Sequence, residues 1–274
     1  MKMNEVGNFS IKPFSINRRV LSDFYDKQSK KHNMIGLLEV DVSKAKQLIS
    51  QYQEKTGEKI SFISWVAKCT SEALNEQPEI HSMRYGKKKL VIFEDIDISV
   101  MVERSVNGKK IPVAKILRKT NEKTIEELSR EIRQAQTEEV KESNQLIGDA
   151  RSSLSLKLFM FFPKFIRRFI FGRTLNNPFK VKKDSGTVII TSVGMFAKEI
   201  SSFVIPFGFL PINIALGGMK RKPGIANDEI KPCTYLQITL IIDHDTVDGA
   251  PATRFVARLV ELMEGAFGLE FIQT

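Results

Sequence analysis

The chain has 274 residues, of which 42% are hydrophobic and 27% charged, and its formal net charge is +10. This composition is typical of a soluble globular protein and excludes a mostly disordered, collagen-like or low-complexity chain. The two cysteines, Cys69 and Cys233, exclude a disulfide framework and a zinc site of four thiolates. We expect both thiols to be reduced and buried, and we expect no bound metal.

The N-terminal residues carry no targeting signal. Residues 1–15 contain no apolar stretch ahead of a small-residue cleavage site, as a secretory signal would require. No run of 18 uncharged apolar residues follows anywhere in the chain, so we expect no membrane span. Together these observations predict a cytoplasmic protein.

The first half of the chain predicts helices and strands in mixed order. Helices are expected over residues 15–30, 44–55 and 61–76, and Pro78 ends the third. Strands are expected over residues 34–42, 90–93, 95–103 and 111–116, with a turn at 107–108. Ser43 is expected to cap the start of the helix over 44–55, and Gly57 to end it. A further helix is expected from Thr120 or Asn121 to Thr137.

The second half predicts more strands and one long final helix. Strands are expected over residues 186–191, 212–216 and 235–242, and the helix over 249–265. We see no repeat and no long linker. The pattern therefore predicts an α/β or α+β fold, a mixed β-sheet flanked by helices, in a single domain spanning residues 1–274.

Between these halves, residues 151–183 form a basic, phenylalanine-rich segment. It holds nine Lys or Arg, no Asp or Glu, and seven of the 19 phenylalanines, while the rest of the chain is nearly neutral. As a helix opened by Pro163 and ended by Gly172, it places its aromatic residues and its cations on opposite sides. This pattern fits a membrane-surface helix over residues 154–171, a clamp for an anionic ligand, a partner-docking helix, or an insertion packed on the protein with solvated cations. We expect no nucleic acid, because no signature of nucleic-acid binding accompanies the segment.

The chain has three histidines, and one of them is placed for chemistry. His32 and His81 lie in polar, turn-like stretches, and we expect both to face solvent without a catalytic role. His244 directly follows an apolar strand, and Asp248 and Gly249 precede the final helix. A neutral imidazole in such a turn suits removal of a proton from a thiol or hydroxyl. The spacing alone also fits a structural histidine.

The sequence around His244 resembles the catalytic motif of a known enzyme family. Four stretches carry the resemblance, in matching order: residues 39–42, 111–114, 186–196 and 244–255, the last reading HDTVDGAPATRF. They are similar to the acyltransferase domain of 2-oxoacid dehydrogenase complexes, a fold shared with bacterial chloramphenicol acetyltransferases. The resemblance covers about residues 15–140 and 184–268.

The resemblance implies a two-layer chloramphenicol acetyltransferase-like fold, a homotrimer, and an active site between two subunits. The implied reaction is acyl transfer between coenzyme A, as acyl-CoA, and a thiol, hydroxyl or lipoyl acceptor. His244 would be the general base on the acceptor. Thr191, with Ser192 as a second candidate, would stabilise the oxyanion. Asp248 would hold the turn rather than exchange protons.

The chain departs from the family pattern in three ways. Asp245 stands where complex-forming enzymes usually have arginine, and the insertion at 151–183 is not typical of them. Arg18 or Arg19 is the candidate partner of Asp248, as in the acetyltransferase branch. No lipoyl domain is recognisable, so we expect a free-standing catalytic domain that carries no lipoyl group.

Two further hypotheses remain open beside acyl transfer to a small acceptor. The first is a non-catalytic trimeric scaffold that docks to a membrane or partner through residues 151–183. The second is acyl transfer to a lipid, with the enzyme peripheral to the membrane. The retained His244, Asp248 and Thr191 favour catalysis.

Overall fold

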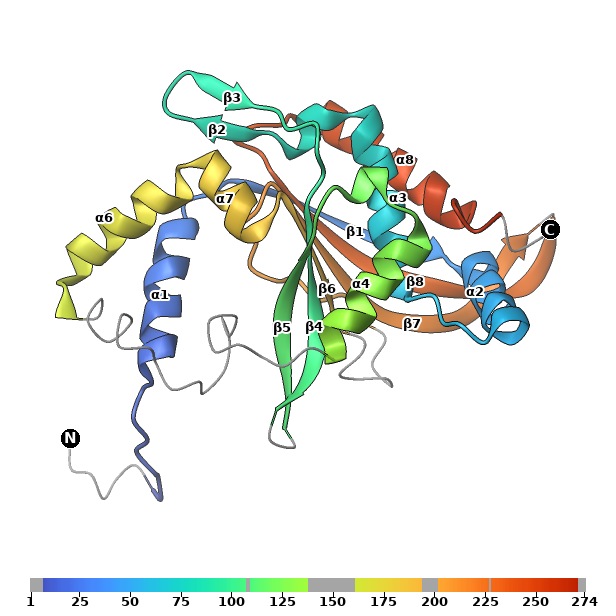
Figure 1. Ribbon diagram of the computed structural model, residues 1–274, viewed down its shortest axis with the longest axis horizontal. Coiled ribbons are helices and arrows are strands. Elements are labelled where there is room, and N and C mark those ends of the chain that lie inside the picture. The colour runs from blue at the N-terminus through green and yellow to red at the C-terminus, as the bar shows by residue number, and fades with distance from the viewer. Residues whose placement is uncertain (1–6, 107–108, 138–160, 194–201, 227, 271–274) are drawn as a thin grey trace.

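A six-stranded mixed sheet forms the centre of the fold in the computed structural model, which describes residues 7–106, 109–137, 161–193, 202–226 and 228–270 (Figure 1). The strand order is β1-β8-β7-β6-β4-β5. Strands β4, β6 and β7 are parallel to one another, and the other pairs are antiparallel. The strands are β1 (Asn33–Asp41), β4 (Ile98–Val106), β5 (Lys109–Leu117), β6 (Val188–Ser192), β7 (Ile212–Ala226) and β8 (Glu229–Asp243).

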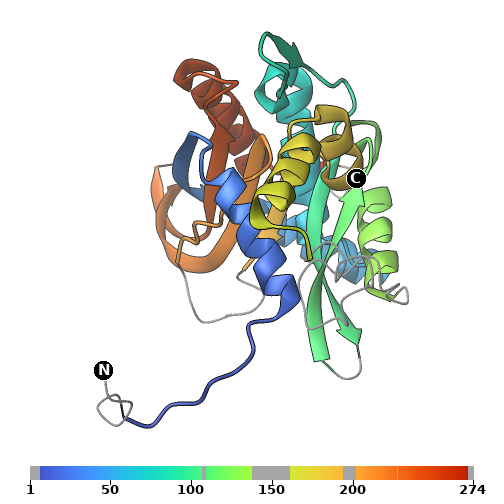
Figure 2. The same cartoon turned by 90° about the vertical axis from the view of Figure 1, so that its left-hand side faces the viewer.

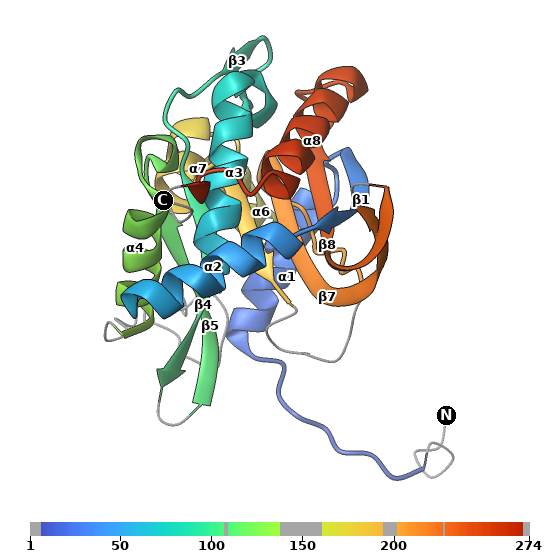
Figure 3. The ribbon, with the colours of Figure 1, turned by 90° about the vertical axis from the view of Figure 1, so that its right-hand side faces the viewer.

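Four helices cover one face of this sheet: α2 (Ser43–Thr56), α3 (Phe62–Glu76), α4 (Ile125–Thr137) and α8 (Gly249–Glu264). Figure 3 shows them in front of the strands. The even-numbered apolar residues of β6, β7 and β8 point into this layer, as strand alternation requires, and Trp65 of α3 and Phe255 of α8 are fully buried there. Burial of this apolar surface is the main stabilising contribution to the fold.

The chain from residue 202 covers part of the opposite face of the sheet, and on that face Ile35 and Leu37 of β1 remain 52% and 50% exposed. A Cβ atom on Gly217 would lie 2.4 Å from the Ser202 carbonyl oxygen, so the covering segment approaches the strand too closely for a larger residue. Helix α1 (Ile16–Gln28) packs on this segment, with Phe24 in edge contact with Phe209 at a centroid distance of 5.6 Å. Residues 7–14 extend away from the body in Figures 1 and 3.

Helix α6 (Lys164–Leu175) lies beside α1, as Figure 2 shows, and α7 (Pro178–Ser185) leads from it to β6. The structure of the basic segment at 161–183 differs from the prediction. Gly172 does not end the helix but is buried within it, and Arg167 points inward to Asp23 at 2.7 Å. Phe165 and Phe169 instead point outward, whereas Phe171 packs against Phe24 of α1 at a centroid distance of 6.4 Å. Residues 151–160 lie outside the described residues.

The remaining elements are short: a two-stranded sheet of β2 (Met83–Tyr85) and β3 (Lys89–Val91), and the 3-10 helices η2 (Pro78–His81) and η3 (Thr120–Glu122). The predicted mixed sheet is confirmed, and the predicted helices are present, but the helix expected from Thr120 or Asn121 starts only at Ile125, after the separate 3-10 turn η3. Helix α2 starts at Ser43 rather than after it, and the Ser43 hydroxyl donates to Asp41 instead. The β7–β8 hairpin extends well beyond the predicted strands, where lysines and prolines obscure the alternation. The predicted turn at 107–108 is outside the described residues.

Both cysteines are free and buried, as predicted. Within the described ranges, no helix is long and apolar enough to cross a bilayer. The same residues contain no group of three or more His, Cys, Asp or Glu side chains placed to hold a metal ion.

Candidate active site

His244 lies in the exposed turn that joins β8 to α8. Its backbone N–H donates to the carbonyl oxygen of His32 at 2.8 Å. Its imidazole forms no hydrogen bond with any described residue. The ring is therefore free to meet a ligand, while the backbone that carries it is fixed.

The two residues beside His244 are held by side chains from the segment between α1 and β1. The Asp243 carboxylate accepts from Lys31 Nζ at 2.6 Å and from the Asp245 N–H at 3.1 Å. The Asp245 carboxylate lies 2.8 Å from His32 Nδ1. This hydrogen bond, followed by the negative charge of Asp245, raises the pKa of His32 above its ordinary value. Asp245, the departure from the family motif, thus has a specific partner.

Asp248 is the residue that precedes α8, with extended backbone. Its exposed carboxylate forms no hydrogen bond or ion pair with a described residue, and neither Arg18 nor Arg19 contacts it. Gly249 then begins the helix. Within one chain, the turn is held at Asp243 and Asp245 rather than at Asp248.

The two candidate oxyanion donors are neighbours at the end of β6, but they face different ways. In β7, Thr191 pairs with Ala215, and Ser192 pairs with Leu216. Leu216 belongs to the core beneath the helices. Because successive strand residues alternate, Ser192 lies on the helix side of the sheet and Thr191 on the opposite face.

One chain does not bring Thr191 to His244. Thr191 is aligned through Ala215 with Thr239 of β8, and His244 follows five residues later, beyond the end of that strand. The offset is about 17 Å along the strands and about 10 Å across two strand spacings. The hydroxyl and the imidazole of one subunit are therefore too far apart to act on the same carbonyl.

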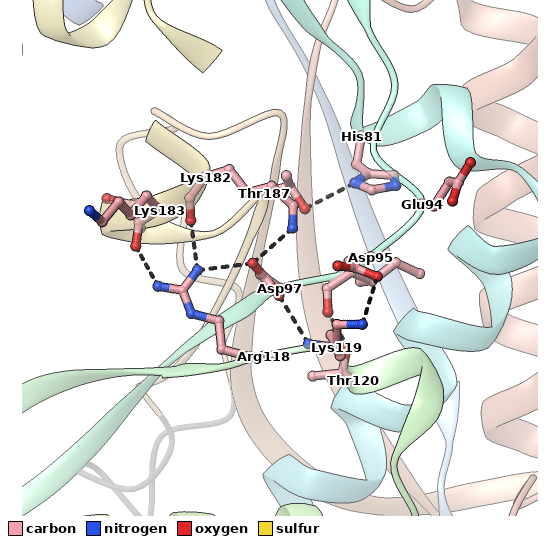
Figure 4. A network of polar contacts seen from close by, with 12 residues as sticks. His81, Glu94, Asp95, Asp97, Arg118, Lys119, Thr120, Lys182, Lys183 and Thr187 are labelled. Atoms are coloured by element: carbon pink, nitrogen blue, oxygen red, sulfur yellow. Dashed lines mark hydrogen bonds and ion pairs between the residues drawn. The ribbon is translucent and has the colours of Figure 1, made fainter. Parts of the chain in front are cut away.

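The prediction that His81 faces solvent is wrong. His81 is the last residue of η2, and its side chain is fully buried. Its Nδ1 lies 2.9 Å from the Thr187 hydroxyl (Figure 4). Nε2 has no hydrogen-bond partner among the described residues. Burial, helped by the charge of Lys182, lowers the pKa of His81 to about 4, so the ring is neutral and structural. The polar residues around His81 in the sequence gave no indication of this contact, because Thr187 is 106 residues away.

Next to His81, a buried carboxylate anchors the start of β6. Asp97 accepts from Arg118 and Lys182 at 2.9 Å each, and from the Lys119 N–H at 2.9 Å (Figure 4). Burial raises the pKa of Asp97, but these donors outweigh burial, so the pKa lies below its ordinary value. The Asp97 carbonyl also accepts from the Thr187 N–H. This network fixes the strand that carries Thr191.

The comparison with protein families decides the assignment. The model described as "2-oxoacid dehydrogenases acyltransferase (catalytic domain)" matches residues 15–147 and 180–269. The chain belongs to this family. The resemblance seen in the motifs is thereby confirmed, and the match omits most of the basic segment.

Relatives and solved structures agree with this assignment. The chain is 23% identical over 257 residues to a dihydrolipoyllysine-residue succinyltransferase component of the mitochondrial 2-oxoglutarate dehydrogenase complex 1 of Arabidopsis thaliana, covering 91% of this chain and 46% of that protein. It is 27% identical over 211 residues to an acetyltransferase component of the pyruvate dehydrogenase complex of Zymomonas mobilis, covering 77% and 39%. The chain thus spans less than half the length of either relative.

The fold is that of an acyltransferase core. The chain superimposes on the cubic core of a pyruvate dehydrogenase multienzyme complex with a TM-score of 0.67 and 15% identity, covering 100% of this chain and 98% of the other. The predicted fold class is confirmed by this similarity.

Motif reasoning found His244 and Thr191 but missed the residues that hold the turn. Lys31 and His32 precede β1 in a polar stretch without a recognisable pattern. Their partners Asp243 and Asp245 are more than 200 positions away in the chain. Only the antiparallel pairing of β1 with β8 brings the two segments together.

Proposed function

We propose that this protein is an acyltransferase that moves an acyl group between acyl-CoA and a thiol or hydroxyl acceptor. The observation that carries the proposal is the exposed imidazole of His244, held by its backbone at the end of β8 in a chain of this family. The acceptor includes a lipoyl thiol carried by another protein. Residues 1–274 act as one catalytic domain, in which the basic segment at 151–183 is an insertion.

In the proposed reaction, His244 removes the proton from the acceptor S–H or O–H. The sulfur or oxygen then attacks the thioester carbonyl carbon, and Thr191 donates a hydrogen bond to the oxyanion that forms. Collapse of this intermediate breaks the bond to the CoA sulfur, which receives the proton from the imidazolium. Asp248, whose carboxylate has no partner among the described residues of its own chain, does not exchange protons in this reaction. No covalent acyl-enzyme is required.

The site requires two copies of the chain. Within one subunit, Thr191 is level with Thr239, five residues before His244, and lies two strands away from β8. We propose that a homotrimer joins the His244 turn of one subunit to the Thr191 strand of its neighbour. This arrangement supports Thr191 over Ser192, because Thr191 lies on the face away from the subunit's own core helices.

The experiment is acyl transfer from acetyl-CoA or succinyl-CoA to dihydrolipoamide, with mass-spectrometric detection of the product. We expect His244→Ala to lower kcat by about 100-fold or more, because a positioned general base contributes that much. Unchanged thermal unfolding of the variant would show that the fold is intact. Undiminished turnover by His244→Ala would overturn the proposal.

A second candidate function, docking to an anionic membrane surface, rests on helix α6. Phe161, Phe165 and Phe169 recur every four residues and are 88%, 73% and 70% exposed. Arg173 on the same helix forms no ion pair with a described residue. Arg168, by contrast, interacts with Asp26, whose pKa is lowered first by the hydrogen bond and charge of Lys164 and then by the charge of Arg168. Exposed aromatics flanked by cations suit insertion at the headgroup level of a bilayer.

A shallow cavity at the end of this helix supports docking to an anionic rather than a neutral membrane surface. Its volume is about 270 Å³, and its lining includes Phe169, Arg173 and Lys180. Lys180 also pairs with Asp184 at 3.3 Å, so Arg173 beside the apolar wall is the cation that would meet a lipid phosphate. The same helix could serve a scaffold without catalysis, so this contact and acyl transfer are tested separately.

The test is sedimentation with vesicles that contain phosphatidylglycerol, compared with pure phosphatidylcholine vesicles. We expect the double variant Phe165→Ser, Phe169→Ser to lose binding to the anionic vesicles. The matched control is Ile225→Ser, Ile230→Ser, which removes an equally exposed apolar pair from the tip of the β7–β8 hairpin. Equal binding by wild type and the α6 variant would end this candidate, and acyl transfer by His244 would be unaffected.

A further inference from the structure

The turn that carries His244 is fastened to the segment before β1 at three successive positions. Lys31 Nζ pairs with Asp243 at 2.6 Å. The His32 carbonyl accepts the His244 N–H at 2.8 Å, and the His32 ring contacts Asp245 at 2.8 Å. His32 thus contacts the turn with both its backbone and its side chain.

We propose that His32 is a positioning residue for His244, and that its hydrogen bond to Asp245 fixes the direction in which the His244 imidazole projects. This inference rests on the proposed acyl transfer. Since the His244 ring has no side-chain partner among the described residues, its direction depends on the backbone of the turn. A general base misplaced by about 1 Å loses much of its effect.

The groups around His32 explain why the contact is specific. Asp245 faces its Nδ1, and the carboxylate of Asp243 adds a second negative charge nearby. Lys31 is already engaged with Asp243 and with the carbonyl of Phe209. His32 is therefore the partner of the Asp245 side chain among the described residues. Removing either side chain breaks the link between Asp245 and the segment before β1, while Thr246 Oγ1 still donates to the Asp243 carbonyl at 3.3 Å.

The decisive experiment is a double-mutant cycle on the full chain, using His32→Ala and Asp245→Ala. We expect each variant to lower kcat by about 10- to 100-fold, with KM little changed, because the base is present but misdirected. The double variant should be no worse than either single variant, since both break the same contact. Multiplicative losses, or no loss in either single variant, would overturn the positioning role.

A conservative replacement separates positioning from general stability. His32→Asn retains a donor near the place of Nδ1, so it should restore most of the activity lost in His32→Ala. Lys231→Ala is the matched control, because Lys231 pairs with Glu229 in an exposed contact at the far end of β8. We expect that control to have wild-type kcat. Failure of Asn to restore any activity would contradict the role.

A measurement without turnover keeps the two proposals distinguishable. The chain has only three histidines, so their imidazole signals can be followed by NMR during a pH titration. We expect Asp245→Asn to lower the pKa of His32, and His32→Ala to shift the backbone N–H signal of His244. If both shifts occur and the wild-type protein transfers no acyl group, the contact is right and the proposed function is wrong. If neither shift occurs, the contact itself is wrong.

Discussion

The side chains of Thr191 and Ser192 lie on opposite faces of the central sheet, because they are neighbours in one strand. Only one of them can point into a site that another subunit completes on the open face. The resemblance to known enzymes left both as candidates for the oxyanion donor. The geometry favours Thr191.

Replacement of each hydroxyl tests this assignment. We expect Thr191→Val, which keeps the shape, to lower kcat by about 100-fold or more, as loss of one oxyanion donor does. Ser192→Ala should change kcat little, and it serves as the matched control. Steady-state acyl transfer to dihydrolipoamide measures both. The opposite ranking would assign the role to Ser192.

The docking of α6 on α1 depends on one buried ion pair. Arg167 and Asp23 have side chains only 13% and 5% exposed, whereas those of Lys164 and Asp26, about one turn away, are 57% and 40% exposed. Asp23→Asn removes the carboxylate from this buried ion pair, which we expect to cost about 3 kcal/mol. The Asp26→Asn control should cost less than about 1 kcal/mol.

Limited proteolysis and urea unfolding would measure the two costs. Cleavage within residues 161–175 should become faster in Asp23→Asn and stay unchanged in Asp26→Asn. Equal behaviour of the two variants would show that burial of the pair contributes nothing.

Gly186, at the start of β6, has no room for a side chain. Its φ is +76°, and a Cβ atom would lie 2.5 Å from the Asp97 carbonyl oxygen. We expect Gly186→Ala to lower the free energy of unfolding by about 2 to 3 kcal/mol, through strain and overlap together. Gly57 has nearly the same φ but open space around it, so Gly57→Ala should cost about 1 kcal/mol. Urea unfolding would compare them, and equal costs would show that the overlap relaxes freely.

The buried His81 predicts an acid-sensitive fold. Its pKa is lowered to about 4 in the folded protein, against 6.5 for an ordinary histidine. The unfolded chain therefore binds a proton first as the pH falls. The free energy of unfolding should decrease as the pH falls from about 6.5 to about 4. Below about pH 4, His81 causes no further decrease.

Protonation of His81 in the unfolded chain should lower the free energy of unfolding by about 3 kcal/mol over this pH interval. We expect His81→Asn, which can still bond Thr187 but does not titrate, to lose correspondingly less stability between pH 6.5 and pH 4. Urea unfolding at several pH values measures the difference. Parallel curves for wild type and variant would contradict a neutral, buried His81.

The sequence predicted well what depends on local periodicity. The alternation in β1 and the apolar side of α8 follow from residues that are close together in the chain, so these elements were located correctly. The residues 244–255 motif likewise located His244 and its turn. Such signals are local, and they survive without knowledge of the tertiary fold.

What could not be predicted depends on distant partners. His81 reads as a surface residue until Thr187 is placed beside it, and Arg167 reads as a solvated cation until α1 presents Asp23. The role of His32 has the same origin, because Asp245 reaches it only through strand pairing. In each case a polar side chain is satisfied by a contact that no sequence window contains.

The distance between Thr191 and His244 has a consequence for any solution of this protein. Every chain carries both groups but holds them too far apart to use its own pair, so under the proposed mechanism a single chain is inactive. Specific activity should therefore fall on dilution, once the concentration drops below that at which the copies separate, although every molecule remains folded.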